Sequence, residues 1–107
     1  MSFFAESQFK KSLNRYLLIL EQYPNDLNAL FYGGLSYYNL GKFEKSMTFF
    51  DQILNGKESV FIEETSWYKT KCLIQLDRKQ EAQELLDEII ASGGFYTKQA
   101  IQLKRTL

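Results

Sequence analysis

The chain has 107 residues, about the length of one domain, and 45% of them are hydrophobic and 16% aromatic, which excludes an intrinsically disordered protein. Because 13 basic side chains balance 13 acidic ones, the cationic excess that a nucleic-acid-binding or anionic-membrane-binding surface requires is absent. The lack of histidine excludes Ser-His-Asp and Cys-His catalysis and the usual zinc ligand sets.

The pattern predicts six helices and no strand. In the first segment apolar residues recur at steps of three and four, which is typical of one helix face. Pro24 stops this helix, Asp26 is the expected N-cap of the next, and Gly41 stands where a left-handed cap ends it. The apolar run Val60-Phe61-Ile62 is expected to pack under the loop 55–63. The predicted helices are 3–22, 27–40, 43–54, 63–76, 79–91 and 95–106.

The chain also repeats itself. Displaced by 34 residues, 9–20 aligns with 43–54, and displaced by 36 residues, 31–54 aligns with 67–90. The two extra residues of the second displacement fall in the loop 55–63. A period in this range is typical of a solenoid made of helix pairs.

This repeat resembles the tetratricopeptide repeat (TPR) family, in the form of a bacterial TPR-like domain. The family pattern W-x2-L-G-x2-Y, then A-x3-F, A and P, is present in degraded form. In the first complete repeat its positions hold Leu30, Gly34, Tyr37, Ser46, Phe50 and Ile53. Pro24 matches the last position of the preceding repeat, whereas Thr70 replaces the glycine in the following one and Ala82 matches.

The resemblance implies an all-α fold, a right-handed superhelical stack of antiparallel helix pairs (a TPR-like α-solenoid) with a C-terminal capping helix. One domain over 1–107 would comprise a partial repeat (1–26), a repeat (27–62), a degenerate repeat (63–94) and a capping helix (95–107). In the predicted capping helix, Tyr96, Ala100, Leu103 and Leu107 share the inner face, and Lys98, Gln102 and Arg105 the outer one.

Two adjacent glycines, Gly33 and Gly34, interrupt the predicted helix 27–40. Each costs roughly 1 kcal/mol relative to alanine in a helix interior, so a close approach is the expected reason for it. The resemblance implies that Gly34 packs against Ser46 of the partner helix, and gives Gly33 a lesser role. Neither phosphate-binding glycine pattern is present.

The resemblance further implies an inner face on the first helices of the repeats, which would bind a peptide or a helix of a partner protein. The candidate groove residues are Asn28, Phe31, Leu35, Tyr38, Glu64, Trp67, Lys71 and Gln75. Aromatic rings with polar flanks are typical of a protein-binding patch. The alternative is that terminal segments fold over the strip and make it core. The family's clamp for C-terminal carboxylates is not expected, because Phe31 and Leu35 occupy its positions.

No residues point to catalysis, a cofactor or a metal. Cys72 lies among apolar helix positions, so a packed thiol is favoured over a nucleophile. Glu63-Glu64 begins a predicted helix, where negative charge complements the dipole, and Asp87-Glu88 belongs to a solvated face rather than to an acid–base pair. We therefore expect no enzyme.

The start of the chain predicts an incomplete surface. Phe3-Phe4 aligns with the end of a first helix whose earlier turns are absent, which leaves Leu17 and Leu18 uncovered. This indicates either a fragment of a longer repeat protein or a homodimer formed through the N-terminal end. The alternative function is accordingly that of a structural, assembly or homodimerisation segment within a larger bacterial protein. That larger protein could be anchored in a membrane.

The compartment is not determined by the residues. A run of about 18 apolar residues is missing, so direct membrane insertion is not expected. The start lacks the charged-then-apolar order of a signal peptide. A soluble, cytoplasmic location is favoured if the chain is complete, and the location is otherwise unknown.

Overall fold

The fold is a computed structural model that describes residues 2–57 and 60–107, and the middle of the predicted loop 55–63 lies outside these ranges. Within them the chain forms six helices and no strand. The helices are α1 (Phe3–Gln22), α2 (Leu27–Asn39), α3 (Phe43–Leu54), α4 (Ile62–Gln75), α5 (Lys79–Ser92) and α6 (Thr97–Arg105). All six predicted helices are confirmed, with ends that differ by two residues or fewer.

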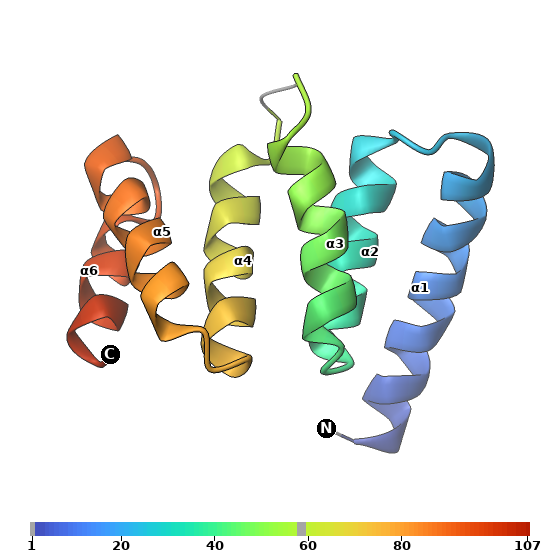
Figure 1. The fold of residues 1–107 in the computed structure, drawn as a ribbon. Coiled ribbons are helices and arrows are strands. Elements are labelled where there is room, and N and C mark those ends of the chain that lie inside the picture. The colour runs from blue at the N-terminus through green and yellow to red at the C-terminus, as the bar shows by residue number, and fades with distance from the viewer. Residues whose placement is uncertain (1, 58–59) are drawn as a thin grey trace.

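Neighbouring helices run in opposite directions and are stacked in chain order, from α1 on the right of Figure 1 to α5 and α6 on the left. Each helix packs mainly against its neighbours in sequence, as in a TPR-like helical stack. In addition α2 contacts α4 directly, so the side of the stack made by these two helices is its inner side.

Short caps end the helices where the sequence predicts. The Asp26 carboxylate accepts a hydrogen bond from the Ala29 backbone N–H at 2.9 Å, so Asp26 is the N-cap of α2. Gly41, with φ of +77°, ends α2 in a left-handed cap. Asp77 takes the same position after α4, with φ of +58°. Helix α4 therefore ends in the same left-handed cap as α2, although no glycine is present.

The predicted contact at Gly34 is confirmed. The Ser46 hydroxyl donates a 2.7 Å hydrogen bond to the Gly34 carbonyl, which joins α3 to α2. A Cβ atom added at Gly34 would lie 2.5 Å from Cε1 of Phe50, whose ring is fully buried. Gly33 has a similar role on a neighbouring side, since its added Cβ would lie 2.9 Å from Phe49 and 3.6 Å from Tyr16 of α1.

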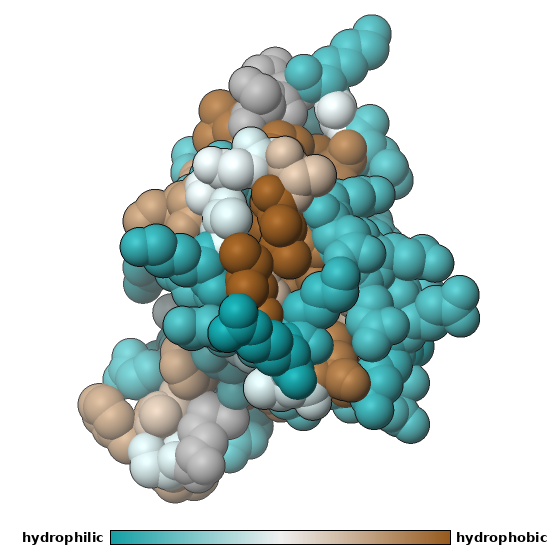
Figure 2. All heavy atoms as spheres, turned by 90° about the vertical axis from the view of Figure 1, so that its left-hand side faces the viewer, coloured by the Kyte–Doolittle hydropathy of each residue, from teal (hydrophilic) through white to brown (hydrophobic). Residues whose placement is uncertain are grey.

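The core runs along the stack as two clusters of buried side chains. The first joins α2, α3 and α4 around Phe50 and Leu73 and reaches Ala82 of α5, and the second joins α4, α5 and α6 around Leu86 and Ala100. The expected inner face of the last helix is therefore present, and its outer residues Lys98, Gln102 and Arg105 are exposed. Figure 2 looks at this end of the molecule and shows a narrow band of hydrophobic side chains bordered by hydrophilic ones.

At the other end, α1 leaves large apolar side chains in solvent. Phe3 is 88% exposed, Phe4 71% and Leu18 65%, whereas Leu17 is half-buried. None of the helices in the described ranges is sufficiently long and apolar to cross a membrane.

Candidate protein-interaction surface

The predicted groove residues lie on α2 and α4, but they differ in how much of each side chain solvent reaches. Phe31 and Trp67 are buried, with only 5% and 8% of their surface exposed. The half-buried members are Leu35, Tyr38, Glu64 and Lys71, and the exposed members are Asn28 and Gln75. The two buried rings, Phe31 and Trp67, therefore form the floor of the surface rather than its contact edge.

Phe31 is covered by the loop that enters α4. The ring of Phe61 stacks on it in parallel, with centroids 4.5 Å apart and an interplanar angle of 3°. Tyr32 and Tyr68 meet the Phe31 ring edge-on. The expected packing of the run Val60-Phe61-Ile62 is thus observed for Phe61 but is wrong for Val60, which is 52% exposed. The cover over Phe31 comes from the loop between the repeats rather than from a chain terminus.

Trp67 is covered from the other side of the stack. Tyr96, directly before α6, stacks on the indole with centroids 5.2 Å apart and an interplanar angle of 13°. The Lys71 ammonium lies 5.3 Å from the centroid of the same ring, a cation–π arrangement. Trp67 and Phe31 belong to different core clusters, and Tyr68 packs against both of them.

Between the two covered rings, Tyr38 and Tyr68 bridge α2 and α4, with ring centroids 5.7 Å apart. Burial raises the pKa of the Tyr38 hydroxyl, and its neighbours Cys72 and Tyr68 raise it further. The hydroxyl therefore stays neutral at physiological pH and can both donate and accept a hydrogen bond.

The predicted set of groove residues left out four aromatic residues that shape this surface, namely Tyr32, Phe61, Tyr68 and Tyr96. A signal existed for Tyr32 and Tyr68, because the displacement of 36 residues aligns them with each other. Tyr32 is 42% exposed and stacks with Tyr16 of α1, which extends the aromatic surface beyond the first complete repeat.

The surroundings of the side chains considered for catalysis or metal binding favour a structural role. Cys72 is fully buried, and burial raises the pKa of its thiol, while the nearby Ser46 hydroxyl lowers it by less. The thiol is therefore protonated at neutral pH. The part of the chain that the structure describes contains no group of three side chains suited to hold a metal ion.

Charged side chains connect the repeats at their outer edges. Lys69 of α4 forms a 2.7 Å ion pair with Asp51 of α3, and Lys104 of α6 pairs with Asp87 of α5. Lys71 forms no ion pair with a carboxylate in residues 2–57 and 60–107.

Comparison with known proteins gives two matches of the same kind. Residues 28–55, which span most of α2 and all of α3, match the family model of the tetratricopeptide repeat. A TPR repeat-containing protein of Methanocaldococcus jannaschii is 32% identical over 83 residues, which are 75% of this chain. The chain spans about a quarter of that relative, 26% of its length. No solved structure gives a significant match.

Proposed function

Because the chain belongs to the tetratricopeptide repeat family, whose repeats generally mediate protein–protein interactions, we propose that it is a non-catalytic module that binds a peptide or helix of a partner protein along α2 and α4. The observation that carries the proposal is the polar rim around a closed aromatic floor. Asn28 and Gln75 are exposed, and Lys71 presents an ammonium over Trp67.

Each part of this surface has a distinct role in the proposed complex. The exposed edges of Leu35 and Tyr38 supply apolar contact with a partner side chain. The amides of Asn28 and Gln75 hydrogen-bond the partner backbone, and Lys71 pairs with an acidic side chain that sets its orientation. The floor rings act through rigidity, since they hold α2 and α4 in place.

The burial of the floor determines how the proposal is tested. Alanine at Phe31 or Trp67 would remove core contacts as well as any binding contact, so loss of a partner would not identify the site. A photo-crosslinking residue at Leu35, in the source cells, should capture a discrete partner. The same residue at exposed Thr48 of α3 is the matched control.

The expected outcome is an adduct at Leu35 that is absent at Thr48 and is weakened by Lys71→Glu. Equal adducts at both positions would mean that α2 and α4 are not the binding face. Circular dichroism of each variant shows whether the helices are intact.

A second candidate, homodimerisation through α1, is favoured by the exposed apolar side chains of that helix. Phe4, Lys11 and Leu18 recur at intervals of seven residues and share one face. In an antiparallel pairing of two copies centred on Lys11, Phe4 of one copy faces Leu18 of the other, and Phe3 faces Ile19. The face is thus self-complementary in its apolar residues, while Lys11 meets its own copy.

Sedimentation analysis tests this second candidate. The protein should form a dimer that strengthens as salt screens the Lys11 repulsion, and Leu18→Glu should return it to monomer. Thr48→Glu is the control for a charge added elsewhere. A monomer at every concentration and salt strength would exclude the dimer.

A further inference from the structure

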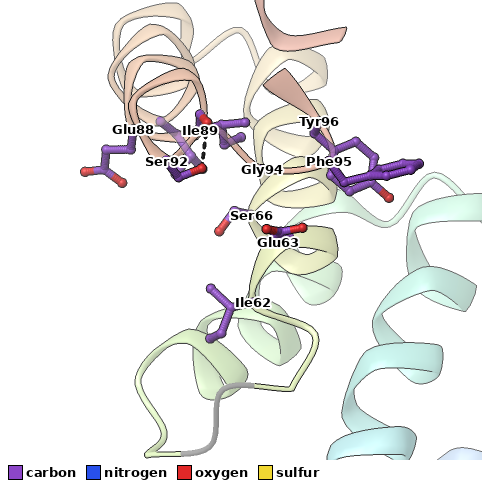
Figure 3. A pocket seen from close by; sticks show the side chains of 10 residues that line it. Ile62, Glu63, Ser66, Glu88, Ile89, Ser92, Gly94, Phe95 and Tyr96 are labelled. Atoms are coloured by element: carbon purple, nitrogen blue, oxygen red, sulfur yellow. Dashed lines mark hydrogen bonds between the residues drawn. The ribbon is translucent and has the colours of Figure 1, made fainter. Parts of the chain in front are cut away.

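The second repeat contains a pocket beside its helix crossing. It has a volume of about 370 Å³ and lies between the start of α4, the end of α5 and the segment that enters α6. In Figure 3, Glu63 and Ser66 project from α4 into the space between α5 and the segment that carries Phe95, while Ile62 lies below them.

The internal repeat explains why this space is hollow. The displacement of 36 residues aligns Leu27 with Glu63 and Leu30 with Ser66. In the first repeat Leu30 is only 3% exposed, and both leucines pack against the core cluster. Serine lacks the carbon atoms that fill the corresponding space, and the Glu63 carboxylate lies against Gly94 instead of packing into the core. The pocket therefore occupies volume that leucine side chains fill one repeat earlier.

The pocket wall combines apolar surface with negative charge. Ile62 and Ile89 supply apolar sides, while Glu63 and Glu88 contribute carboxylates. Neither carboxylate pairs with a lysine or arginine among the residues that the structure describes. Gly94 makes room for the Glu63 carboxylate, since a Cβ atom at Gly94 would collide with it.

An exposed aromatic ring completes the wall. Phe95 is 73% exposed, and its ring meets Tyr96 edge-on with centroids 5.0 Å apart. A large exposed ring beside unpaired carboxylates complements a planar cation, because guanidinium groups stack on aromatic faces and pair with carboxylates.

We propose that this pocket binds an arginine side chain of a partner polypeptide. The methylene groups of the arginine lie against Ile62 and Ile89, and its guanidinium stacks on Phe95 and pairs with Glu63. The pocket is separate from the Leu35–Lys71 surface of α2 and α4, so this proposal does not rest on the proposed function. Either one can fail while the other stands.

Titrations followed by nuclear magnetic resonance test the proposal on the whole chain. The probe is Nα-acetyl-arginine N-methylamide, and its neutral isostere Nα-acetyl-citrulline N-methylamide is the matched control. The arginine probe should shift the amide signals of Glu63, Ser66 and the Gly94–Tyr96 segment, and the citrulline probe should bind more weakly. Glu63→Gln should weaken the arginine probe roughly two- to fivefold, the range of a solvent-exposed ion pair. Glu84→Gln, an exposed carboxylate of α5 outside the pocket, should leave it unchanged.

Filling the pocket is the decisive variant. Ser66→Leu places in the second repeat the side chain that the first repeat has at Leu30, so the fold should persist while the arginine probe no longer binds. Unchanged binding to a folded Ser66→Leu protein would overturn the proposal. If that variant does not fold, equal affinities for the arginine and citrulline probes would overturn it as well.

Discussion

The two adjacent glycines of α2 should respond differently to the same substitution. Alanine is the better helix former by about 1 kcal/mol, so propensity alone predicts that either replacement stabilises the protein. At Gly34, however, the added Cβ would lie 2.5 Å, 2.9 Å and 3.1 Å from three atoms of the Phe50 ring. That ring has no exposed surface, and it lies in the centre of the first core cluster. It cannot move away without displacing its neighbours.

At Gly33 the added Cβ would lie 2.9 Å from Cε2 of Phe49, a half-buried ring that can turn toward solvent. Overpacking a tight core costs about 1–3 kcal/mol, which exceeds the propensity gain at Gly34 and roughly equals it at Gly33. Gly34→Ala should therefore lower the free energy of unfolding by about 1–2 kcal/mol, and Gly33→Ala should change it by less than about 0.5 kcal/mol. Gly34→Leu should be more severe than Gly34→Ala.

Urea unfolding followed by circular dichroism measures both variants on one scale. A loss of about 1 kcal/mol corresponds to a decrease in the thermal midpoint of about 4–8 °C for a domain of this size. Equal effects at the two positions, or a Gly34→Ala protein as stable as the wild type, would refute the contact between α2 and the Phe50 ring.

Asp77→Gly should raise the free energy of unfolding by up to about 1 kcal/mol, because Asp77 holds a left-handed conformation that Gly41 adopts without strain, and urea unfolding measures the gain. Ser46→Ala should lower it by about 1 kcal/mol in the same assay, since the Gly34 carbonyl would lose its buried donor. Burial raises the pKa of the Cys72 thiol, so the unfolded thiol ionises first. Stability should thus be unaffected by this group below about pH 8.5, the ordinary thiol pKa, and decline as pH rises through the raised folded value. Cys72→Ala should show a smaller decline over that range, and an equal decline would contradict the assignment.

Helix positions could be predicted from the sequence because they depend on local rules. The periodic apolar residues, the Asp26 cap and the left-handed Gly41 act within a few residues, and the structure reproduces them. The Gly34–Ser46 contact could be predicted because the resemblance placed two small residues at a helix crossing. The prediction of these features does not depend on the conformation of the loops.

The exposure of the aromatic strip could not be predicted in the same way. Phe31 and Trp67 are buried by Phe61 and Tyr96, which lie in the segments directly before α4 and α6. Phe61 also has φ of +67°, a conformation that a bulky side chain rarely adopts and that no residue-type rule predicts. The direction of such a loop depends on the packing that it completes.

The two repeats bury the same positions where their helices cross, although Thr70 and Ala82 replace Gly34 and Ser46 there. They differ in burial at positions that fill the space beside the crossing. Phe50 and its counterpart Leu86 are both fully buried, and Leu40 and Leu76 both precede a left-handed cap. In a stack each repeat is stabilised mainly by its own crossing and by its neighbours, so a position such as Ser66 can lose its filling side chain while the crossing persists. Positions where aligned repeats depart from each other without a change in the crossing are therefore where a surface specific to this protein can arise. The pocket at Glu63 and Ser66 is therefore favoured over the buried floor of α2 and α4 as the source of partner selectivity.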